Sequence, residues 1–513
     1  MMTVVVNRQD PRFDTLKRGH NARFPLTDAE APDRILLCSS PEEVAQALRK
    51  VVAAGLRPTV RSGGHCYEDF VSNNPHGAML DLSLYNTVDR DGEHGPYRVA
   101  PGAVLGDVYL ELYKRYDLTL PAGSCYMVGA GGHISGGGYG FLSRLHGLTS
   151  DWISAVDILT VDGKGHVIER RVDKDHDPDL LRACRGAGGG NFGIITSFRF
   201  DKLPPAPREV AQANLIFDWA TMTEDRFTQV LTTYGDYWEG RGKDRDTWGL
   251  FTLMDITPAK RGHFGIYIQY CQPDGTAKDL SVLEEFLNRF AAFQPMLLQA
   301  HGSLISRQGP SVAGRKIQKG QESLNSVREI AVRPALDVTI GEGGSGSPTR
   351  GKYKSSYMKR SFTPAEASTI YRFYNSDQIT AQNSVLSVDS YGGAINRPEL
   401  ANQTAIAQRS SIMKLQWQCY WREASGDQIH LEQLDKFYTD LYTGSHVDAH
   451  HQGTPWGERY EGCYMNYPDS DMLRYAYWPE LYYGRDGLYP FLQQVKQKYD
   501  PNNVFHSSMS VQE

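Results

Sequence analysis

The stretch DRILLCSSPEEVAQALRKVVAAGLRPTVRSGGH, residues 33–65, determines how the amino-terminal part of the chain folds. Apolar residues 35–38 predict a short buried strand, and RPTVRS (57–62) predicts a second one. Between them, Ser40 and Glu43 have the spacing of a capping box at the start of an apolar-periodic helix. The segment therefore predicts a βαβ unit whose second strand leads directly into the glycines of SGGH.

The loop that follows, RSGGHCYEDF (61–70), places two glycines beside a histidine and a cysteine. Three readings are open at this point. The loop is a metal site, a plain turn, or a backbone that lies against a cofactor. Glycines favour the last reading, because a chain without side chains can approach a ligand closely.

Composition restricts the function classes. The 513 residues predict two domains. The net charge of −6 gives no basic surface for nucleic acid or for anionic membranes. The seven cysteines are dispersed and form no CxxC pair, which argues against a disulfide framework or a structural zinc site. With no secretory signal and no apolar run of about 20 residues, a cytoplasmic protein is expected.

The pattern of expected secondary structure changes after PPAP, residues 204–207. Before it, strand and helix patterns alternate, and ISAVDILTVDGKGHVIER (153–170) predicts a hairpin that turns at Asp162-Gly163. After it, runs such as IMKLQWQCYWR (412–422) predict long antiparallel strands, with helical segments between them. We therefore expect domains at 1–204 and 205–462, with the segment 463–513 returning to the first domain.

Two segments of the second half have individual expectations. The segment GEGGSGSPTRG (341–351) predicts a surface loop or a lid. The segment KYKSSYMKR (352–360) predicts a solvated strand face, since lysines are mostly exposed. A substrate-side patch is the alternative for the second segment.

A second glycine-rich stretch, PAGSCYMVGAGGHISGGGYGFLSRLHGL (121–148), also contains a cysteine and a histidine. It lacks the GxGxxG spacing and the strand–helix context of a dinucleotide-binding Rossmann fold. It also lacks the GK[ST] of a P-loop. Metal binding is disfavoured because ligands do not cluster; the adjacent His450 and His451 do not share a face on a helix or a strand.

Together, RSGGHCYED, Cys125 with GAGGHISGGGYGFLSRLHGL, RGAGGGNFGIITSF (185–198) and the tail CYMNYPDSDM (463–472) resemble the berberine-bridge-enzyme-like flavin oxidases of the vanillyl-alcohol-oxidase superfamily. The resemblance covers the first 200 residues and the last fifty strongly, and the middle weakly. It is greatest with bacterial members that oxidise free sugars or sugars attached to antibiotics. It implies an α+β, two-domain FAD-binding fold of the PCMH type. The substrate domain would be an antiparallel sheet covered by helices.

The resemblance implies FAD bound by two covalent bonds, from His65 to the 8α-methyl carbon and from Cys125 to C6. It places the pyrophosphate on the backbone of residues 61–67, His133 near the ribityl chain, and Ile194 and Ile195 at the adenine end. The implied cofactor-binding residues are Arg61, Ser62, Gly63, Gly64, His65, Cys66, Tyr67, Cys125, Val128, Gly129, Gly132, His133, Tyr139, Ile194, Ile195, Tyr464 and Asn466. Cys66 matches no attachment position, so its side chain is expected to be structural.

For catalysis, the resemblance implies Tyr467 as the base, with Tyr139 and Tyr391 as further active-site tyrosines. Asp389 lies two residues before Tyr391, on the same expected strand face, and is a candidate partner that tunes Tyr467. Because burial raises the pKa of a tyrosine, something must lower that of Tyr467, such as hydrogen bonds to the phenolate or a nearby positive charge. Tyr139 is a candidate donor.

The leading function is hydride transfer from an alcohol carbon of a carbohydrate or sugar-bearing natural product to the flavin, with O2 reduced to H2O2. Val128, three residues after Cys125, is where the family's oxygen-reactive face is expected, and a small residue there predicts an oxidase. Oxidative C–N or C–C ring closure on an alkaloid or polyketide is the alternative. A flavin-binding module without catalysis is a third reading, opposed by the presence of Tyr467, His65 and Cys125.

Overall fold

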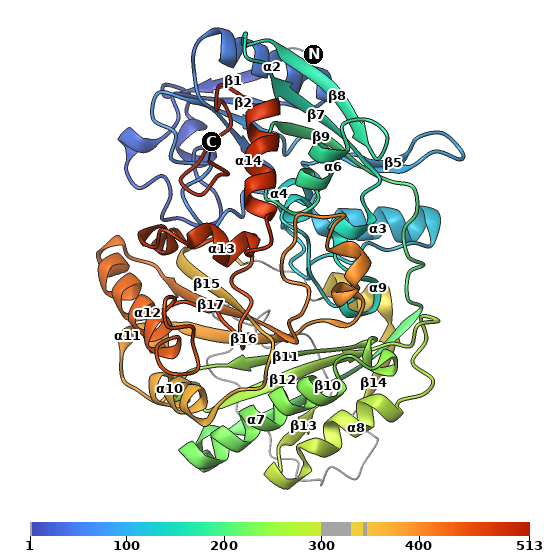
Figure 1. The fold of residues 1–513 in the computed structure, drawn as a ribbon, viewed down its shortest axis with the longest axis vertical. Coiled ribbons are helices and arrows are strands. Elements are labelled where there is room, and N and C mark those ends of the chain that lie inside the picture. Colours follow the sequence, from blue (N-terminus) through green and yellow to red (C-terminus); the bar gives the residue numbers. More distant parts are fainter. Residues whose placement is uncertain (1–2, 299–329, 342–345, 513) are drawn as a thin grey trace.

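The computed structural model describes residues 3–298, 330–341 and 346–512. Their strands form three sheets, of four, five and eight strands. In Figure 1 the two smaller sheets and the amino-terminal helices lie in the upper half, and the eight-stranded sheet lies below them.

The four-stranded sheet contains the predicted βαβ unit. Its order is β1-β2-β4-β3, with β2, β3 and β4 parallel and β1 antiparallel at the edge. The strands are β1 (Val4–Asn7), β2 (Arg34–Leu37), β3 (Pro58–Arg61) and β4 (Ala78–Asp81), and α2 (Pro41–Ala53) connects β2 to β3. Ser40 caps α2 by accepting from the Glu43 amide, as predicted. The Glu43 carboxylate instead accepts from Ser39, one residue before the cap.

The five-stranded sheet is antiparallel, with the order β5-β6-β9-β7-β8. Its strands are β5 (Val88–Arg90), β6 (Tyr97–Val99), β7 (Ala155–Val161), β8 (Val167–Asp173) and β9 (Ile194–Phe200). The predicted hairpin is the β7–β8 pair. Its positive-φ residue is Gly165, at +82°, and not Gly163.

The eight-stranded sheet is antiparallel, with the order β13-β10-β12-β11-β16-β17-β15 and β14 paired to β10. Its strands are β10 (Glu209–Asp218), β11 (Leu250–Ile256), β12 (His263–Tyr270), β13 (Met296–Leu298), β14 (Ala331–Pro334), β15 (Arg350–Met358), β16 (Ser384–Ser390) and β17 (Met413–Trp421). The helices α7 (Glu224–Arg241), α8 (Ser281–Arg289), α10 (Pro364–Tyr374), α11 (Ile379–Gln382) and α12 (Asp427–Leu441) lie on the side away from the amino-terminal half (Figure 1). This is the predicted antiparallel sheet covered by helices.

The remaining helices lie between and around the sheets. They are α1 (Phe13–Leu16), α3 (Leu105–Tyr116), α4 (Ala130–Ser135), α5 (Ser143–His146), α6 (Pro178–Cys184), α9 (Ala335–Gly341), α13 (Trp478–Tyr483) and α14 (Leu488–Tyr499). The carboxyl-terminal α14 returns to the amino-terminal half, where it lies beside α6 (Figure 1). Tyr483 of α13 donates to the Ala187 carbonyl there. The fold is α+β, as predicted; the domain boundaries at 204 and 462 stay a prediction.

One prediction from the middle of the chain is wrong. The segment 352–360 was expected to be a solvated strand face, but Lys352 and Lys354 are 1% and 0% exposed. Both lysines are neutralised by carboxylates from distant segments, which the local pattern cannot reveal. The predicted loop at 341–351 lies partly outside the described residues, and Arg350 and Gly351 already belong to β15.

Candidate cofactor and active site

A cavity of about 3100 Å³ lies between the two glycine-rich loops and the eight-stranded sheet. All of the predicted cofactor-binding residues line it, and so do the candidate active-site residues Tyr467, Tyr139 and Asp389. Segments that are far apart in the sequence therefore meet around one space. Among the described residues, no group of three or more His, Cys, Asp or Glu side chains could hold a metal ion.

The glycines of the two loops bring one backbone against the other. A Cβ on Gly63 would lie 2.4 Å from the Gly129 nitrogen, and a Cβ on Gly129 would lie 2.1 Å from the Gly63 nitrogen. Ser62 fixes the contact, because its hydroxyl donates to the Pro101 carbonyl and accepts from the Gly131 amide. Glycine is thus required here for loop packing as well as for access of a ligand to the backbone.

Arg61 lines the cavity, but only its backbone is available to bind a ligand there. Its guanidinium is buried and forms an ion pair with Asp81, and it also donates to the carbonyls of Leu16 and Arg18. The side chain therefore anchors the end of β3, and the backbone of the following residues is left to face the cavity. This is consistent with the expectation that the backbone of 61–67 contacts the pyrophosphate.

His65 lies against a second histidine, His20, with ring centroids 4.4 Å apart. Burial, and secondarily His20, lowers the pKa of His65 to about 4. At neutral pH the His65 imidazole is therefore neutral, and one ring nitrogen keeps a lone pair that can form a bond. His20 was not found from the sequence, because a lone histidine 45 residues earlier carries no local signal.

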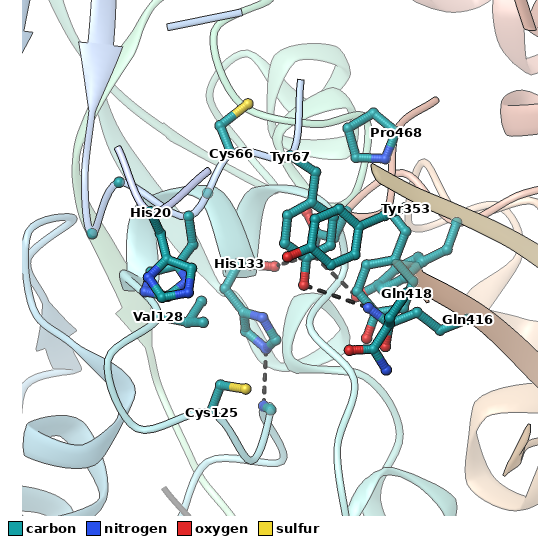
Figure 2. Close-up of a pocket in the computed structure, with 18 of the residues that line it drawn as sticks. His20, Cys66, Tyr67, Cys125, Val128, His133, Tyr353, Gln416, Gln418 and Pro468 are labelled. Atoms are coloured by element: carbon teal, nitrogen blue, oxygen red, sulfur yellow. Dashed lines mark hydrogen bonds between the residues drawn. The ribbon is translucent and has the colours of Figure 1, made fainter. Parts of the chain in front are cut away.

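The two cysteines of the site differ in accessibility. Cys125 is exposed and lines the cavity, whereas burial raises the pKa of the Cys66 thiol to about 12. Figure 2 shows the Cys66 sulfur pointing away from Cys125 and His133. Cys125 is therefore the more exposed of the two, since Cys66 is half-buried, and the structural role expected of Cys66 stays a prediction.

His133 has a structural partner on each side. Its Nε2 accepts from the Gly123 amide at 3.0 Å, and its carbonyl accepts from Asn466 Nδ2 at 2.9 Å. Asn466 also donates to the Tyr464 hydroxyl. Burial lowers the pKa of His133 to about 4, with a smaller effect of Lys414. These bonds connect the second glycine loop to the carboxyl-terminal tail.

Three tyrosine rings form a stack along the cavity wall. The Tyr67 ring lies 3.5 Å from that of Tyr353 and 5.6 Å from that of Tyr467, measured between centroids. Tyr353 is on β15, Tyr67 follows His65 by two residues, and Tyr467 is in the tail. The stack therefore connects the first glycine loop, the sheet and the tail. Figure 2 shows its Tyr67 and Tyr353 rings face to face.

The charge beside Tyr467 comes from Lys414, which the sequence analysis did not identify. Lys414 Nζ lies 2.5 Å from Asp389 Oδ2, 3.4 Å from the Tyr467 hydroxyl and 4.5 Å from the centre of the Tyr467 ring. Lys414 is on β17 and Asp389 is its cross-strand partner on β16, so both side chains project from the same face of the sheet. The ammonium thus lies between a carboxylate and a phenol.

Burial raises the pKa of Tyr467 well above 10, and the negative charge of Asp389 raises it further. A charged Asp389 therefore does not lower the pKa of Tyr467, and its role as a partner of Tyr467 stays a prediction. Burial also raises the pKa of Asp389, an effect that Lys414 opposes. The cation that can stabilise a phenolate here is Lys414, because it is the positive group in contact with the hydroxyl.

The other two candidate tyrosines have different positions. Tyr139 lines the cavity, but its hydroxyl donates to the Ser390 carbonyl and not to Tyr467. Lys414 Nζ lies 4.6 Å from the centre of the Tyr139 ring. Tyr391 is fully buried, donates to the Gln408 carbonyl and is not among the described residues that line the cavity. Because β16 ends at Ser390, Tyr391 does not continue the strand face of Asp389, and its role in catalysis stays a prediction.

Gln416 and Gln418 also line the cavity and were not identified from the sequence (Figure 2). With Lys414 they occupy alternate positions of β17. The sequence signal was the alternation itself: in MKLQWQCYW the polar residues K, Q, Q and Y share one face. Both faces of β17 are almost entirely buried, so the alternation does not separate a solvent face from a core face as it usually does.

Two family models match this chain, one in its amino-terminal part and one at its carboxyl-terminal end. The model described as FAD binding domain matches residues 32–169, which contain both glycine loops. The model described as berberine and berberine like matches residues 463–512, which contain Tyr467. None of the described helices is both long and apolar enough to span a membrane.

Relatives of known name match nearly the whole chain. Aclacinomycin-N/aclacinomycin-A oxidase of Streptomyces galilaeus is 32% identical, over 99% of this chain and 89% of its own length. Hexose oxidase of Chondrus crispus is 32% identical, over 98% of this chain and 94% of its own length. Among solved structures, a glycopeptide hexose oxidase in complex with teicoplanin is 30% identical with a TM-score of 0.84, covering 100% of this chain and 99% of the other.

Proposed function

Because the chain belongs to the berberine-bridge-enzyme-like family of FAD-linked oxidases and is an FAD-dependent oxidoreductase, we propose that it oxidises an alcohol carbon of a carbohydrate or of a sugar-bearing natural product. The observation that carries this proposal is the Tyr467–Lys414–Asp389 group on the wall of the cavity that the two glycine loops also line. By their names, the relatives reported above are an aclacinomycin oxidase, a hexose oxidase and a glycopeptide hexose oxidase.

The residues around the cavity fit FAD. The lining glycines of the two loops leave backbone open to a pyrophosphate and a flat ring; they are Gly63, Gly64, Gly129, Gly131 and Gly132. The neutral His65 and the accessible Cys125 suit covalent attachment. When bound there, FAD would supply the hydride acceptor for the alcohol carbon, and O2 would be the final acceptor of the two electrons and of two protons, to give H2O2. We assign the two attachment bonds to His65 and Cys125.

The protein residues handle the proton of the alcohol. As hydride leaves the substrate carbon, the hydroxyl proton must move to a base within about 2.6–3.2 Å. Tyr467 accepts it as a phenolate. Lys414 neutralises the phenolate through a charge-assisted hydrogen bond, and it neutralises Asp389 when that carboxylate is the charged group instead. One negative charge can therefore be shared between Tyr467 and Asp389, with the ammonium in contact with both.

The polar wall of the cavity favours a sugar over ring closure on an alkaloid or polyketide. Gln416 and Gln418 present amide donors and acceptors, and Tyr353 and Tyr67 present aromatic faces. Hydroxyl groups and the apolar face of a sugar ring need this combination. A carbon skeleton that closes a ring has no need of it.

The proposal is tested with purified yellow protein and a panel of mono- and oligosaccharides and glycosylated antibiotics. Hydrogen peroxide should form with at least one of them. Intact mass should exceed that of the chain by one FAD, and acid precipitation should leave the colour in the pellet. His65→Ala or Cys125→Ala alone should keep flavin attached, and only the double variant should release it. Flavin in the supernatant of the wild-type protein would exclude covalent attachment.

The choice of O2 as electron acceptor is tested separately at Val128. Its backbone lies in the turn that contains Cys125, with the Val128 amide donating to the Cys125 carbonyl, and its side chain lines the cavity. Val128→Leu adds one methylene, which a close-packed site does not absorb freely. Reoxidation by O2 should slow by about tenfold or more, while reduction by substrate survives. Equal reoxidation rates in the two proteins would contradict this assignment.

A further inference from the structure

The other face of β15 carries a cluster of buried charges that the proposed reaction does not use. It consists of Lys352 and Lys354 with Glu68, Asp435, Asp469 and Asp471. Lys352, Lys354, Glu68 and Asp469 have side chains that are at most 3% exposed. We call it the carboxylate–lysine cluster.

The cluster connects three segments that also form the active site. Glu68 follows His65 by three residues, Asp469 follows Tyr467 by two, and the lysines are on β15. Lys352 Nζ lies 2.6 Å from Glu68 Oε1 and 2.7 Å from Asp469 Oδ1. It is therefore a direct bridge between the first glycine loop and the tail.

Side chains from the opposite face of the same strand contact the same two segments. Tyr353 lies between Lys352 and Lys354 in the sequence and stacks on Tyr67, while Ser355 accepts from the Tyr464 amide and donates to the Tyr467 carbonyl. Successive side chains of a strand point to opposite faces. β15 therefore fixes the loop and the tail from both of its faces.

A purely stabilising role would not require charges here. Removing ions from water costs several kcal/mol for each ion, and apolar residues often serve stability equally well. What paired charges provide is a defined set of partners. Ser470 donates to Glu68 as well, so the loop and the tail also interact directly beside Lys352.

We infer that Lys352 is a positioning residue, which sets the first glycine loop, with His65, against the tail segment, with Tyr467. This inference rests on the proposed function, since it concerns the residues that would bind FAD and accept the proton. Lys354 provides a matched comparison. It is equally buried, but its partners are Asp469, Asp471 and Asp435, so it connects the tail to α12. Within the described part of the chain it forms no ion pair with the loop.

The experiment compares Lys352→Met with Lys354→Met, as purified holoenzymes. Digestion and mass spectrometry give the fraction of the His65 peptide that carries flavin, and amide hydrogen exchange reports on residues 62–70 and 463–474. Lys352→Met should at least halve flavin attachment at His65 and raise exchange in both segments. Lys354→Met should leave attachment at His65 unchanged and raise exchange only in the tail.

The kinetics should separate in the same way. With Lys352→Met, kcat should fall about tenfold or more with KM within about twofold, because a displaced base or acceptor affects the reacting geometry and not the rest of the binding surface. Where Lys352→Met folds poorly, Glu68→Gln provides the same test. It keeps the shape of the side chain and removes only the charge that Lys352 contacts.

Two outcomes are distinguishable. Identical attachment, exchange and kinetics in Lys352→Met and Lys354→Met would overturn the inference and leave a cluster that only stabilises the fold. Absence of flavin from the wild-type His65 peptide would instead overturn the attachment part of the proposed function. In that case exchange in residues 62–70 still decides whether Lys352 connects the loop to the tail.

Discussion

Two buried lysine sites lie on neighbouring strands and have opposite surroundings. Lys414 of β17 faces the cavity with one carboxylate, Asp389, and with the rings of Tyr139, Tyr464 and Tyr467 within 6 Å. In the carboxylate–lysine cluster, Lys352 and Lys354 are each in contact with three carboxylate groups. The number of carboxylates around each ammonium is the main difference.

That difference determines what each site can do. For Lys352, burial works to lower the pKa, but the charges of Asp469, Glu68 and Asp471 outweigh it and raise the pKa. The three carboxylates therefore keep the Lys352 ammonium protonated. At Lys414 the ammonium contacts one carboxylate and one phenol, and a single negative charge can be held by either of them. One site positions segments, and the other can support movement of a proton.

The largest effect is expected when the hydroxyl of Tyr467 is removed, because only the Lys414 site is proposed to handle a proton. Tyr467→Phe keeps the ring that stacks near Tyr67 and deletes only the hydroxyl that Lys414 contacts. FAD should still bind, and the rate at which substrate bleaches the flavin absorbance should fall about 100-fold or more, as expected for loss of a general base. Stopped-flow spectroscopy measures this rate. A wild-type rate would place the base elsewhere, and Tyr139 would be tested next.

Lys414→Met and Lys354→Met compare the two sites directly. Lys414→Met removes the cation paired with the buried Asp389, and Lys354→Met leaves Asp469 and Asp471 to share Lys352. Each variant should lose about 3–5 kcal/mol of stability, measured by denaturant unfolding. Only Lys414→Met also removes the cation beside Tyr467, so substrate-driven flavin reduction should fall about 10- to 100-fold in this variant. In Lys354→Met, the rate for each loaded, folded molecule should change by less than threefold. Equal losses of rate would show that buried charge alone explains the effect.

The comparison also shows what could be predicted from the sequence. The glycine loops with His65 and Cys125 were found because their signal is local: bare backbone must stand next to the residues that use it. Segment 352–360 was misinterpreted because lysines are usually exposed, and the carboxylate that pairs with Lys352 is 284 residues away in the chain. Lys414 was missed for the same reason, since its partners lie on another strand and in the tail. Long-range charge pairing leaves no local pattern.

The smallest expected effect is on the pH dependence of stability, to which Asp389 and Asp471 should contribute with opposite signs. At the cavity, burial raises the pKa of Asp389 above its ordinary 3.8. In the cluster, burial works to raise the pKa of Asp471, but Lys354 and Lys352 outweigh it and lower the pKa below 3.8. A raised carboxyl pKa contributes stability that is present at low pH and lost as pH rises through the folded value. A lowered one contributes stability that is present above the ordinary value and lost as pH falls.

Asp389→Asn and Asp471→Asn should therefore change the pH profile of Tm in separate windows. The Tm of Asp389→Asn should rise relative to that of wild type as pH rises above about 4, because the variant has no buried carboxylate to ionise. Asp471→Asn should have a lower Tm than wild type near neutral pH. Most of this difference should disappear as pH falls below about 4, because the wild type then loses the stabilisation from the charged Asp471. Asp377→Asn, in an exposed pair with Lys260, controls for the removal of one surface charge. If both buried variants shift in the same window and with the same sign, the two lysine sites are electrostatically equivalent, and the division between a proton-handling site and a positioning site fails.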